Sequence, residues 1–232
     1  MRILGLCIAL TGVLTFCAIG SFAQSVGSKE SFIPKGYRLL TEATGDLNKD
    51  GVSDLALVVE NTDPGNFQVE PDRLGLDTLN LNDRILFILA GTGGGNFRKI
   101  AQNKGLLPSE NSDVQSCLAD PLMQDGGIAI EKGLLKIDLQ YWYSCGSWYI
   151  THNTYTLRWQ ANRMQLIGFD SKSLHRASGE SSATSINFST GKRKEITGTN
   201  EFEGPENPKT TWKNLQNRQP VYLEDLFEEI DF

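Results

Sequence analysis

Short apolar runs interrupted by Gly, Asn and Asp dominate the chain from about residue 53 to residue 169. They are rich in β-branched and aromatic residues, which is typical of strands, and none keeps the i, i+3, i+4, i+7 spacing of a long amphipathic helix. We expect strands at Asp54–Glu60, Arg84–Ala90, Phe97–Ala101, Ile128–Glu131, Leu134–Tyr143, Trp148–Trp159 and Arg163–Phe169. Helical turns are expected only at Asp113–Leu118 or Leu223–Ile230. The predicted fold class is therefore mainly β.

Alternation of apolar and polar residues is clearest in the longest of these runs. Its apolar positions are Leu135, Ile137, Leu139, Tyr141 and Tyr143, and they alternate with Lys136, Asp138, Gln140 and Trp142. One apolar face for each strand indicates a sheet that packs on one side. Turn residues at 131–133 and 161–162 separate neighbouring runs and predict two hairpins. We therefore expect an antiparallel, sandwich-like single domain.

The chain becomes polar over residues 171–220, which are rich in Ser, Thr, Asn, Lys and Glu. Short strands are expected here at Ile186–Phe188 and Glu195–Thr197, and the remainder is expected to be partly loop. The ending, residues 221–232, is apolar again. It has enough apolar side chains to dock on the core, although an exposed tail is the alternative.

The first 23 residues predict a signal peptide. Residues 3–19 carry no charge, follow Arg2, and lead to Ser21-Phe22-Ala23, a small-x-small cleavage pattern. The mature domain, residues 24–232, is then expected in the periplasm or outside the cell. In the alternative, a lipoprotein is anchored at Cys17, although Phe16 stands where a lipobox has a small residue. A retained anchor helix is the third option, but residues 3–19 fall short of the roughly 20 residues of a membrane-spanning helix.

Charge and hydropathy exclude two classes of partner from our expectations. The formal net charge is −6, whereas a protein that follows nucleic-acid phosphates presents a basic face. Lys192–Lys194 form a short basic spot that is more typical of a solvated surface. After the leader no apolar run is long enough to span a bilayer, so we expect no membrane span and no nucleic acid.

Cys117 and Cys145 are the two cysteines that remain after the leader. An even pair in an oxidising compartment predicts a disulfide. Closing this loop would restrict the unfolded chain by about 3.5 kcal/mol on the chain-entropy estimate. A nucleophilic cysteine would instead need a base nearby, and neither histidine, His152 or His175, has a sequence context that marks it as one.

One segment, residues 46–54, carries the oxygen spacing of a calcium loop. Its positions 1, 3, 5 and 9 hold oxygen side chains, and Gly51 at position 6 allows the sharp turn. The expected ligands are the side chains of Asp46, Asn48, Asp50 and Asp54 and the backbone carbonyl of Val52. Leu57 takes the place of the closing Glu of an EF-hand, which predicts a structural Ca²⁺ of weak affinity, on the order of 10⁻⁴ to 10⁻³ M. The alternative is an Asp/Asn/Gly-rich turn that binds nothing.

Residues 45–56 (GDLNKDGVSDLA) resemble the calcium loop and following strand of the FG-GAP/VCBS repeat, found in integrin α propellers and in many exported bacterial proteins. Residues 85–97 (ILFILAGTGGGNF) are similar to the later strand and glycine turn of that repeat. The resemblance covers about residues 45–101 and implies calcium ligation by the loop residues named above. A propeller needs several such repeats, and no second Asp-x-Asn-x-Asp-Gly occurs here, so we do not expect a full propeller. The whole chain resembles exported bacterial proteins of unassigned function that carry one such unit.

Five aromatic residues fall within residues 141–149, around Cys145. The alternation places Trp142 opposite Tyr141 and Tyr143. If Trp142, Trp148 and Tyr149 are exposed, they form a surface for a sugar ring or a protein partner. The alternative is a hairpin core clamped by the disulfide. The glycines at 91–95 are expected to form a hairpin turn, because no Lys-Ser/Thr follows them as in a phosphate loop.

Taken with the leader, these features predict a calcium-stabilised β-rich binding module of the bacterial cell envelope, with a protein or glycan partner. One alternative is an envelope hydrolase that uses a carboxylate pair such as Asp120 and Asp125. Another is an inhibitor or immunity protein that blocks a secreted enzyme. No catalytic residues are assigned.

Overall fold

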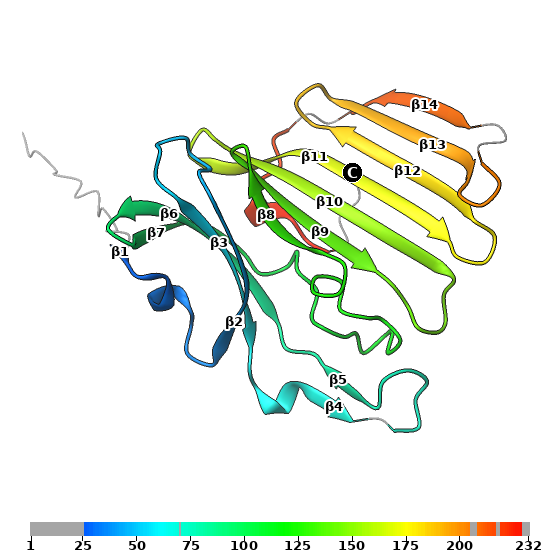
Figure 1. The fold of residues 1–232 in the computed structure, drawn as a ribbon, viewed down its shortest axis with the longest axis horizontal. Coiled ribbons are helices and arrows are strands. Elements are labelled where there is room, and N and C mark those ends of the chain that lie inside the picture. The colour runs from blue at the N-terminus through cyan, green and yellow to red at the C-terminus, as the bar shows by residue number, and fades with distance from the viewer. Residues whose placement is uncertain (1–25, 70, 205–207, 217–218, 229–232) are drawn as a thin grey trace, which may run out of the picture.

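Two antiparallel sheets form the body of the molecule (Figure 1). The computed structural model describes residues 26–69, 71–204, 208–216 and 219–228, and every structural statement below refers to them. The predicted signal peptide, residues 1–23, lies outside the described residues, as does Cys17. The described strands form open sheets in a sandwich-like single domain and do not form the blades of a propeller, which confirms the predicted fold class.

The five-stranded sheet has the order β1-β7-β6-β3-β2. Its strands are β1 (Val26–Gly27), β2 (Tyr37–Gly45), β3 (Asp54–Asn61), β6 (Arg84–Gly93) and β7 (Asn96–Asn103). The sequences of β3 and β6 are nearly continuous apolar runs because both faces of these strands are buried. One face packs on the second sheet, and the other face is covered by Phe32 and Ile33 of the N-terminal segment, at the short 3-10 helix η1 (Lys29–Phe32). The predicted hairpin turn between β6 and β7 is present and consists of Gly94 and Gly95, while Gly91 and Gly93 belong to the end of β6.

The seven-stranded sheet has the order β14-β13-β12-β11-β10-β9-β8. Its strands are β8 (Gly127–Glu131), β9 (Leu134–Tyr141), β10 (Tyr149–Gln160), β11 (Arg163–His175), β12 (Glu180–Asn187), β13 (Lys192–Asn200) and β14 (Lys209–Asn214). Both predicted hairpins are present, since Glu131 pairs with Leu134 and Gln160 pairs with Arg163. The two residues of each turn have positive φ, as a tight right-twisted hairpin requires.

The polar region 171–220 contains more strand than its sequence predicted. Strand β11 continues to His175, β12 and β13 are longer than expected, and β14 was not predicted. Neither β13 nor β14 has a buried residue, so these strands extend the sheet beyond the core. Their sequence shows no apolar face because they have none to bury.

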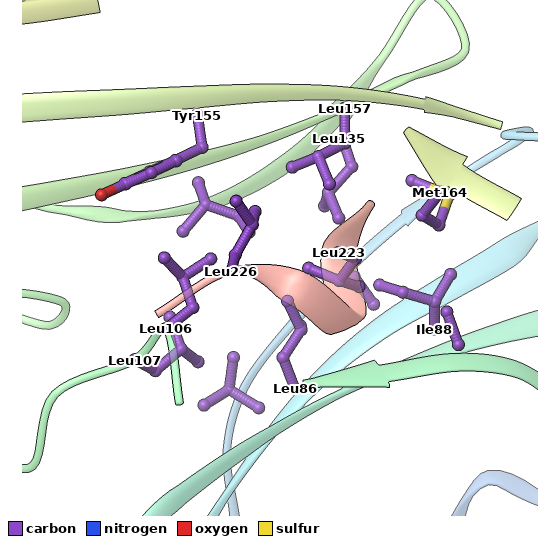
Figure 2. Close-up of a cluster of buried hydrophobic side chains, with 14 of the residues drawn as sticks. Leu86, Ile88, Leu106, Leu107, Leu135, Tyr155, Leu157, Met164, Leu223 and Leu226 are labelled. Carbon is purple, nitrogen blue, oxygen red and sulfur yellow. The ribbon is translucent and has the colours of Figure 1, made fainter. Parts of the chain in front are cut away.

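The main core lies between the two sheets (Figure 2). The five-stranded sheet contributes Leu86 and Ile88, and the seven-stranded sheet contributes Leu135, Leu157 and Met164. The alternation predicted for β9 is present, since its odd-numbered leucines and isoleucine are buried while the residues between them are partly exposed. Each such buried aliphatic side chain contributes roughly 1.5 to 3 kcal/mol to folding.

The C-terminal segment docks between the sheets, which settles the alternative left open by its sequence. Leu223, the first residue of the short 3-10 helix η3 (Leu223–Asp225), and Leu226, which follows its last residue, are fully buried in the core (Figure 2). Asn103 of β7 donates hydrogen bonds from its amide to the carbonyls of both leucines, at 2.6 and 2.8 Å. The helical turn predicted here is present, whereas residues 113–118 form bends and turns.

The insertion between β3 and β6 folds into a small hairpin of its own (Figure 1). It contains η2 (Pro64–Asn66), β4 (Phe67–Val69) and β5 (Thr78–Asn80). Its tip is fixed to the loop that crosses from β7 to β8, because Ser116 Oγ donates to the carbonyl of Leu74 at 2.5 Å and the Leu76 amide donates to the Ser116 carbonyl at 3.3 Å.

Candidate functional site

The loop between β2 and β3, residues 46–53, is wound around the side chain of Asp46. The carboxylate of Asp46 accepts hydrogen bonds from the backbone amides of Lys49, at 2.6 Å, and Gly51, at 3.0 Å. Lys49 and Gly51 both have positive φ, and glycine is the residue that adopts this conformation without strain. The turn that a calcium loop requires is therefore present in the backbone.

Asn48 and Asp50 lie at the accessible end of this loop. Asn48 Oδ1 accepts from the amide of Asp50 at 3.0 Å, and Asp50 Oδ1 accepts from the amide of Val52 at 2.8 Å. The side-chain amide of Asn48 also donates to Asp50 Oδ2 at 2.8 Å. Asp46, Asn48 and Asp50 are thus gathered in one short, partly exposed turn, with oxygen atoms of the type that Ca²⁺ prefers.

Asp54 has a different environment from the other predicted ligands. It is completely buried, and its carboxylate accepts three backbone hydrogen bonds, from Leu47 at 2.8 Å, Asn48 at 3.3 Å and Gly91 at 2.9 Å. Asp54 therefore ties the start of the loop to β6. The described residues contain no group of three or more His, Cys, Asp or Glu side chains arranged to hold a metal, so a cation here would depend on Asn48 and the Val52 carbonyl as well as on carboxylates.

The loop also joins the two sheets. Leu47 is buried in the main core, Gly45 packs against Ile130 of β8, and Lys49 lies over the β8–β9 turn, with its Cε 3.2 Å from the position a Cβ would take at Gly133. An ordered loop would therefore hold the end of β2 against β8. The side chains of Asp46, Asn48 and Asp50 are the groups of this loop that could hold a cation.

The predicted aromatic surface divides into buried and exposed members. Tyr141 and Tyr143 are partly buried and face a cavity, and Trp142 is also partly buried. Trp148 is 61% exposed and Tyr149 is 50% exposed. The first half of this segment packs against the domain, as expected for a hairpin core, and its second half presents two aromatic rings to solvent, as expected for an exposed surface. Each of the two alternatives therefore holds for part of the segment.

Arg176 packs against two of these rings, the partly buried Trp142 and the exposed Trp148. Its guanidinium carbon lies 5.2 Å from the ring centre of Trp142 and 5.6 Å from that of Trp148, which is the range of cation–π contact. Its Nη2 donates to the backbone carbonyls of Tyr143 at 2.8 Å and Ser147 at 2.7 Å. The segment 142–148 is therefore clamped by one side chain, which lowers the entropy lost when a partner binds.

His175, the neighbour of Arg176, contacts the other exposed ring. The rings of His175 and Tyr149 meet edge to face, with their centres 4.9 Å apart. Sequence analysis missed the roles of Arg176 and His175, because they follow from the pairing of Tyr149 with His175 in the β10–β11 register. The length to which β11 extends decides this pairing, and the polar sequence after Phe169 gave no signal of it.

Cys117 and Cys145 form the predicted disulfide, with their Cα atoms 5.3 Å apart. The bond joins the β7–β8 crossing loop to the aromatic segment. It is reinforced by hydrogen bonding from the Ser144 amide to the Cys117 carbonyl at 2.9 Å and by a β-bridge between Leu118 and Tyr143. The aromatic surface is thus anchored by both the disulfide and Arg176.

The carboxylates considered for hydrolysis have other partners. Asp120 receives two hydrogen bonds from the guanidinium of Arg84 and one from each of the backbone amides of Leu122 and Met123. Asp125 accepts from Gln140 Nε2 at 2.9 Å. Neither lines the cavity beside Tyr141. Their contacts give both side chains a structural role.

No protein-family model, curated protein or solved structure matches this chain. The fold itself therefore defines the class: a two-sheet antiparallel β domain with an internal disulfide. Among the described residues, no helix has the length and apolar character needed to cross a membrane.

Proposed function

We propose that this protein is an exported binding module of the cell envelope, which uses Trp142, Trp148 and Tyr149 to hold a glycan or protein partner. The observation that carries the proposal is that Trp148 and Tyr149, two adjoining aromatic residues, are at least half exposed while their surroundings are fixed. A monomeric domain gains stability by burying such rings. Because these two rings are instead exposed on a clamped segment, we infer that they contact a binding partner.

The chemistry of this surface suits a sugar ring or a flat protein patch. Aromatic faces offer a large contact area at low entropy cost, and the guanidinium of Arg176 adds a positive charge beside the rings of Trp142 and Trp148. Such rings are enriched among the residues that dominate binding energies. Export is supported by the leader-like N-terminus and by the disulfide, because disulfides persist in oxidising compartments.

We further propose that the loop at residues 46–54 binds a structural Ca²⁺ with weak affinity, as the FG-GAP/VCBS-like sequence implies. Its role would be to neutralise Asp46 and Asp50 and to fix the junction of β2 with β8. The loop geometry described above supports this, since the turn and the oxygen donors are both present. Extracellular modules with calcium sites of this weak class are saturated only where calcium is abundant.

Binding to an envelope fraction tests the partner surface. The purified domain is incubated with insoluble cell-wall glycan and, separately, with detergent-solubilised envelope proteins under cross-linking. Wild type should be retained by one of the two fractions, and Trp148→Ala with Tyr149→Ala should abolish retention. Trp212→Ala is the matched control, because Trp212 is also 61% exposed and also has a cation over its ring, Lys194. Equal loss in the control and the double variant would contradict the proposal, as would retention by neither fraction.

A further inference from the structure

A cavity of about 490 Å³ lies at the end of β9, against the loop that crosses from β7 to β8. Its volume falls within the roughly 300–1,000 Å³ range of small-molecule sites. Tyr141 and Tyr143 line one side, Asp113 and its neighbours in the crossing loop line another, and Glu228 of the C-terminal segment completes it. With Leu81, which precedes β6, the cavity takes side chains from four separate parts of the chain, so no local sequence motif predicts it.

The charged residues of this cavity all have the same sign. Asp113 and Glu228 are acidic, and no Lys, Arg or His is among the described residues that line it. The hydroxyl of Tyr141 hydrogen-bonds to Glu228. Glu228 is exposed, so this contact places its carboxylate beside the phenol of Tyr141 in the wall of the cavity.

The tyrosines keep their protons in this environment. Burial, and after it the charge of Glu228, raises the pKa of Tyr141 and of Tyr143 above the usual value for tyrosine. Both rings therefore stay neutral, and the negative faces of their π-systems attract cations. Leu81 and Leu118 add apolar wall between these polar groups.

We propose that this cavity binds a small organic ammonium ion. A cation gains from the aromatic faces and from the two carboxylates together, and its alkyl groups contact the leucines. An anion would be repelled by both acids, and a neutral molecule would use the apolar wall alone. The site uses different side chains from the exposed Trp148–Tyr149 surface, so either proposal can fail without the other.

The wall that carries the tyrosines is held rigidly. Tyr143 forms a β-bridge with Leu118, and the adjoining Cys117–Cys145 disulfide closes the same two segments on each other. A site fixed before binding loses less entropy when it is occupied. The positions of the two rings are thus set by the fold and do not depend on the ligand.

Titration with choline, and with its uncharged carbon analogue 3,3-dimethylbutan-1-ol, tests this inference. The two probes have nearly the same shape and differ in charge. The ring resonances of Tyr141 and Tyr143 in NMR spectra should shift saturably with choline, and the neutral analogue should bind at least about fivefold more weakly. Equal affinity for the two probes, or no saturable shift by about 50 mM choline, would overturn the proposal.

Variants locate the binding. Glu228→Gln should weaken choline binding by about fivefold and leave the neutral analogue unaffected, because it removes one charge and keeps the shape. Tyr143→Leu should weaken choline by about threefold or more. Glu203→Gln, an exposed residue in the turn after β13, is the control and should not alter affinity. Circular dichroism confirms that each variant is folded, and choline binding that is unchanged in Glu228→Gln would overturn the assignment.

Discussion

The guanidinium of Arg84 donates two hydrogen bonds to the carboxylate of Asp120, at 2.7 and 2.6 Å. Arg84 lies in β6 and is fully buried, and it also donates twice to Glu60 of β3, at 3.0 Å each. Arg38 of β2 reaches the second oxygen of Glu60 at 2.6 Å. This network of ion pairs therefore links three neighbouring strands to the crossing loop that carries Asp120.

Replacing Arg84 by methionine should destabilise the domain by about 3 to 5 kcal/mol, because it leaves Glu60 buried with a weakened counter-charge. Arg38→Met is the matched control. Its side chain is 58% exposed although it pairs with the same glutamate, so its loss should cost about 1 kcal/mol or less. Denaturant unfolding followed by tryptophan fluorescence measures both. If the two variants lose the same stability, burial does not govern the strength of this network.

Calcium should raise the unfolding temperature of the wild type but not of Asp50→Asn. In 10 mM Ca²⁺, a site with a dissociation constant on the order of 10⁻³ M stabilises by about 1.4 kcal/mol, or about 3 to 6 °C for a domain of this size. The asparagine keeps an oxygen that can accept from the Val52 amide, as Asp50 does, and removes the negative charge. It also loses the oxygen that accepts from the side-chain amide of Asn48, so it should be somewhat less stable than the wild type in chelator. Calcium binding is therefore judged from the change in unfolding temperature between chelator and calcium for each protein. If the wild type melts at the same temperature in chelator and in calcium, the loop does not bind the ion.

Apolar pattern and turn chemistry were sufficient to predict the strands that contribute fully buried residues to the main core, whereas β2, whose Leu40 and Ala43 are only partly buried there, was not predicted. Strands such as β3 and β9 were found because burial imposes either a continuous apolar run or a strict alternation. Strand β14 was missed because it buries nothing, and its residues are held by pairing with β13. Edge and extension strands of this kind follow from hydrogen bonding between segments, which a local pattern does not reveal.

The candidate sites also differ in whether a local sequence pattern or contacts between distant segments define them. The spacing of Asp46, Asn48 and Asp50 is local, so the sequence predicted the loop that the structure shows. The clamp formed by Arg176 depends on the register of β10 with β11. The cavity at Tyr141 depends on the C-terminal segment returning to the core, which places Glu228 beside residues far earlier in the chain.

Leu226→Ala should cost about 2 to 5 kcal/mol of stability, because it opens a cavity between the two sheets. Leu226 is fully buried, whereas its neighbour Phe227 is 61% exposed. Phe227→Ala is therefore the control and should cost much less. Denaturant unfolding compares the two, and similar losses would show that the C-terminal segment does not contribute to the core in solution as it does in the structure.

Stability should fall as the pH rises from about 10 to about 12, and Tyr155 should account for part of that fall. Burial, followed by the charge of Glu228, raises the pKa of Tyr155 to about 12, while an unfolded tyrosine titrates near pH 10. The folded chain therefore keeps its proton in this range after the unfolded chain has lost it. The contribution of Tyr155 is fully present below pH 10 and is lost progressively above it, with a slope of up to about 1.4 kcal/mol per pH unit.

Tyr155→Phe tests this effect, and Tyr37→Phe tests the same linkage at a second tyrosine, so the stability of both variants should depend less on pH above pH 10 than that of the wild type. A hydrogen bond to Asp83 raises the pKa of Tyr37, also to about 12, without deep burial. The free energy of unfolding of each variant is measured by denaturant titration at intervals from pH 9 to pH 12, a window that spans both the unfolded and folded pKa values. At neutral pH, Tyr155→Phe should differ in stability from the wild type only through the change in packing. Above pH 10, its free energy of unfolding should fall less steeply with pH than that of the wild type. If the curves of wild type and Tyr155→Phe stay parallel throughout, the phenol of Tyr155 titrates alike in the folded and unfolded chains and is not shielded by the core.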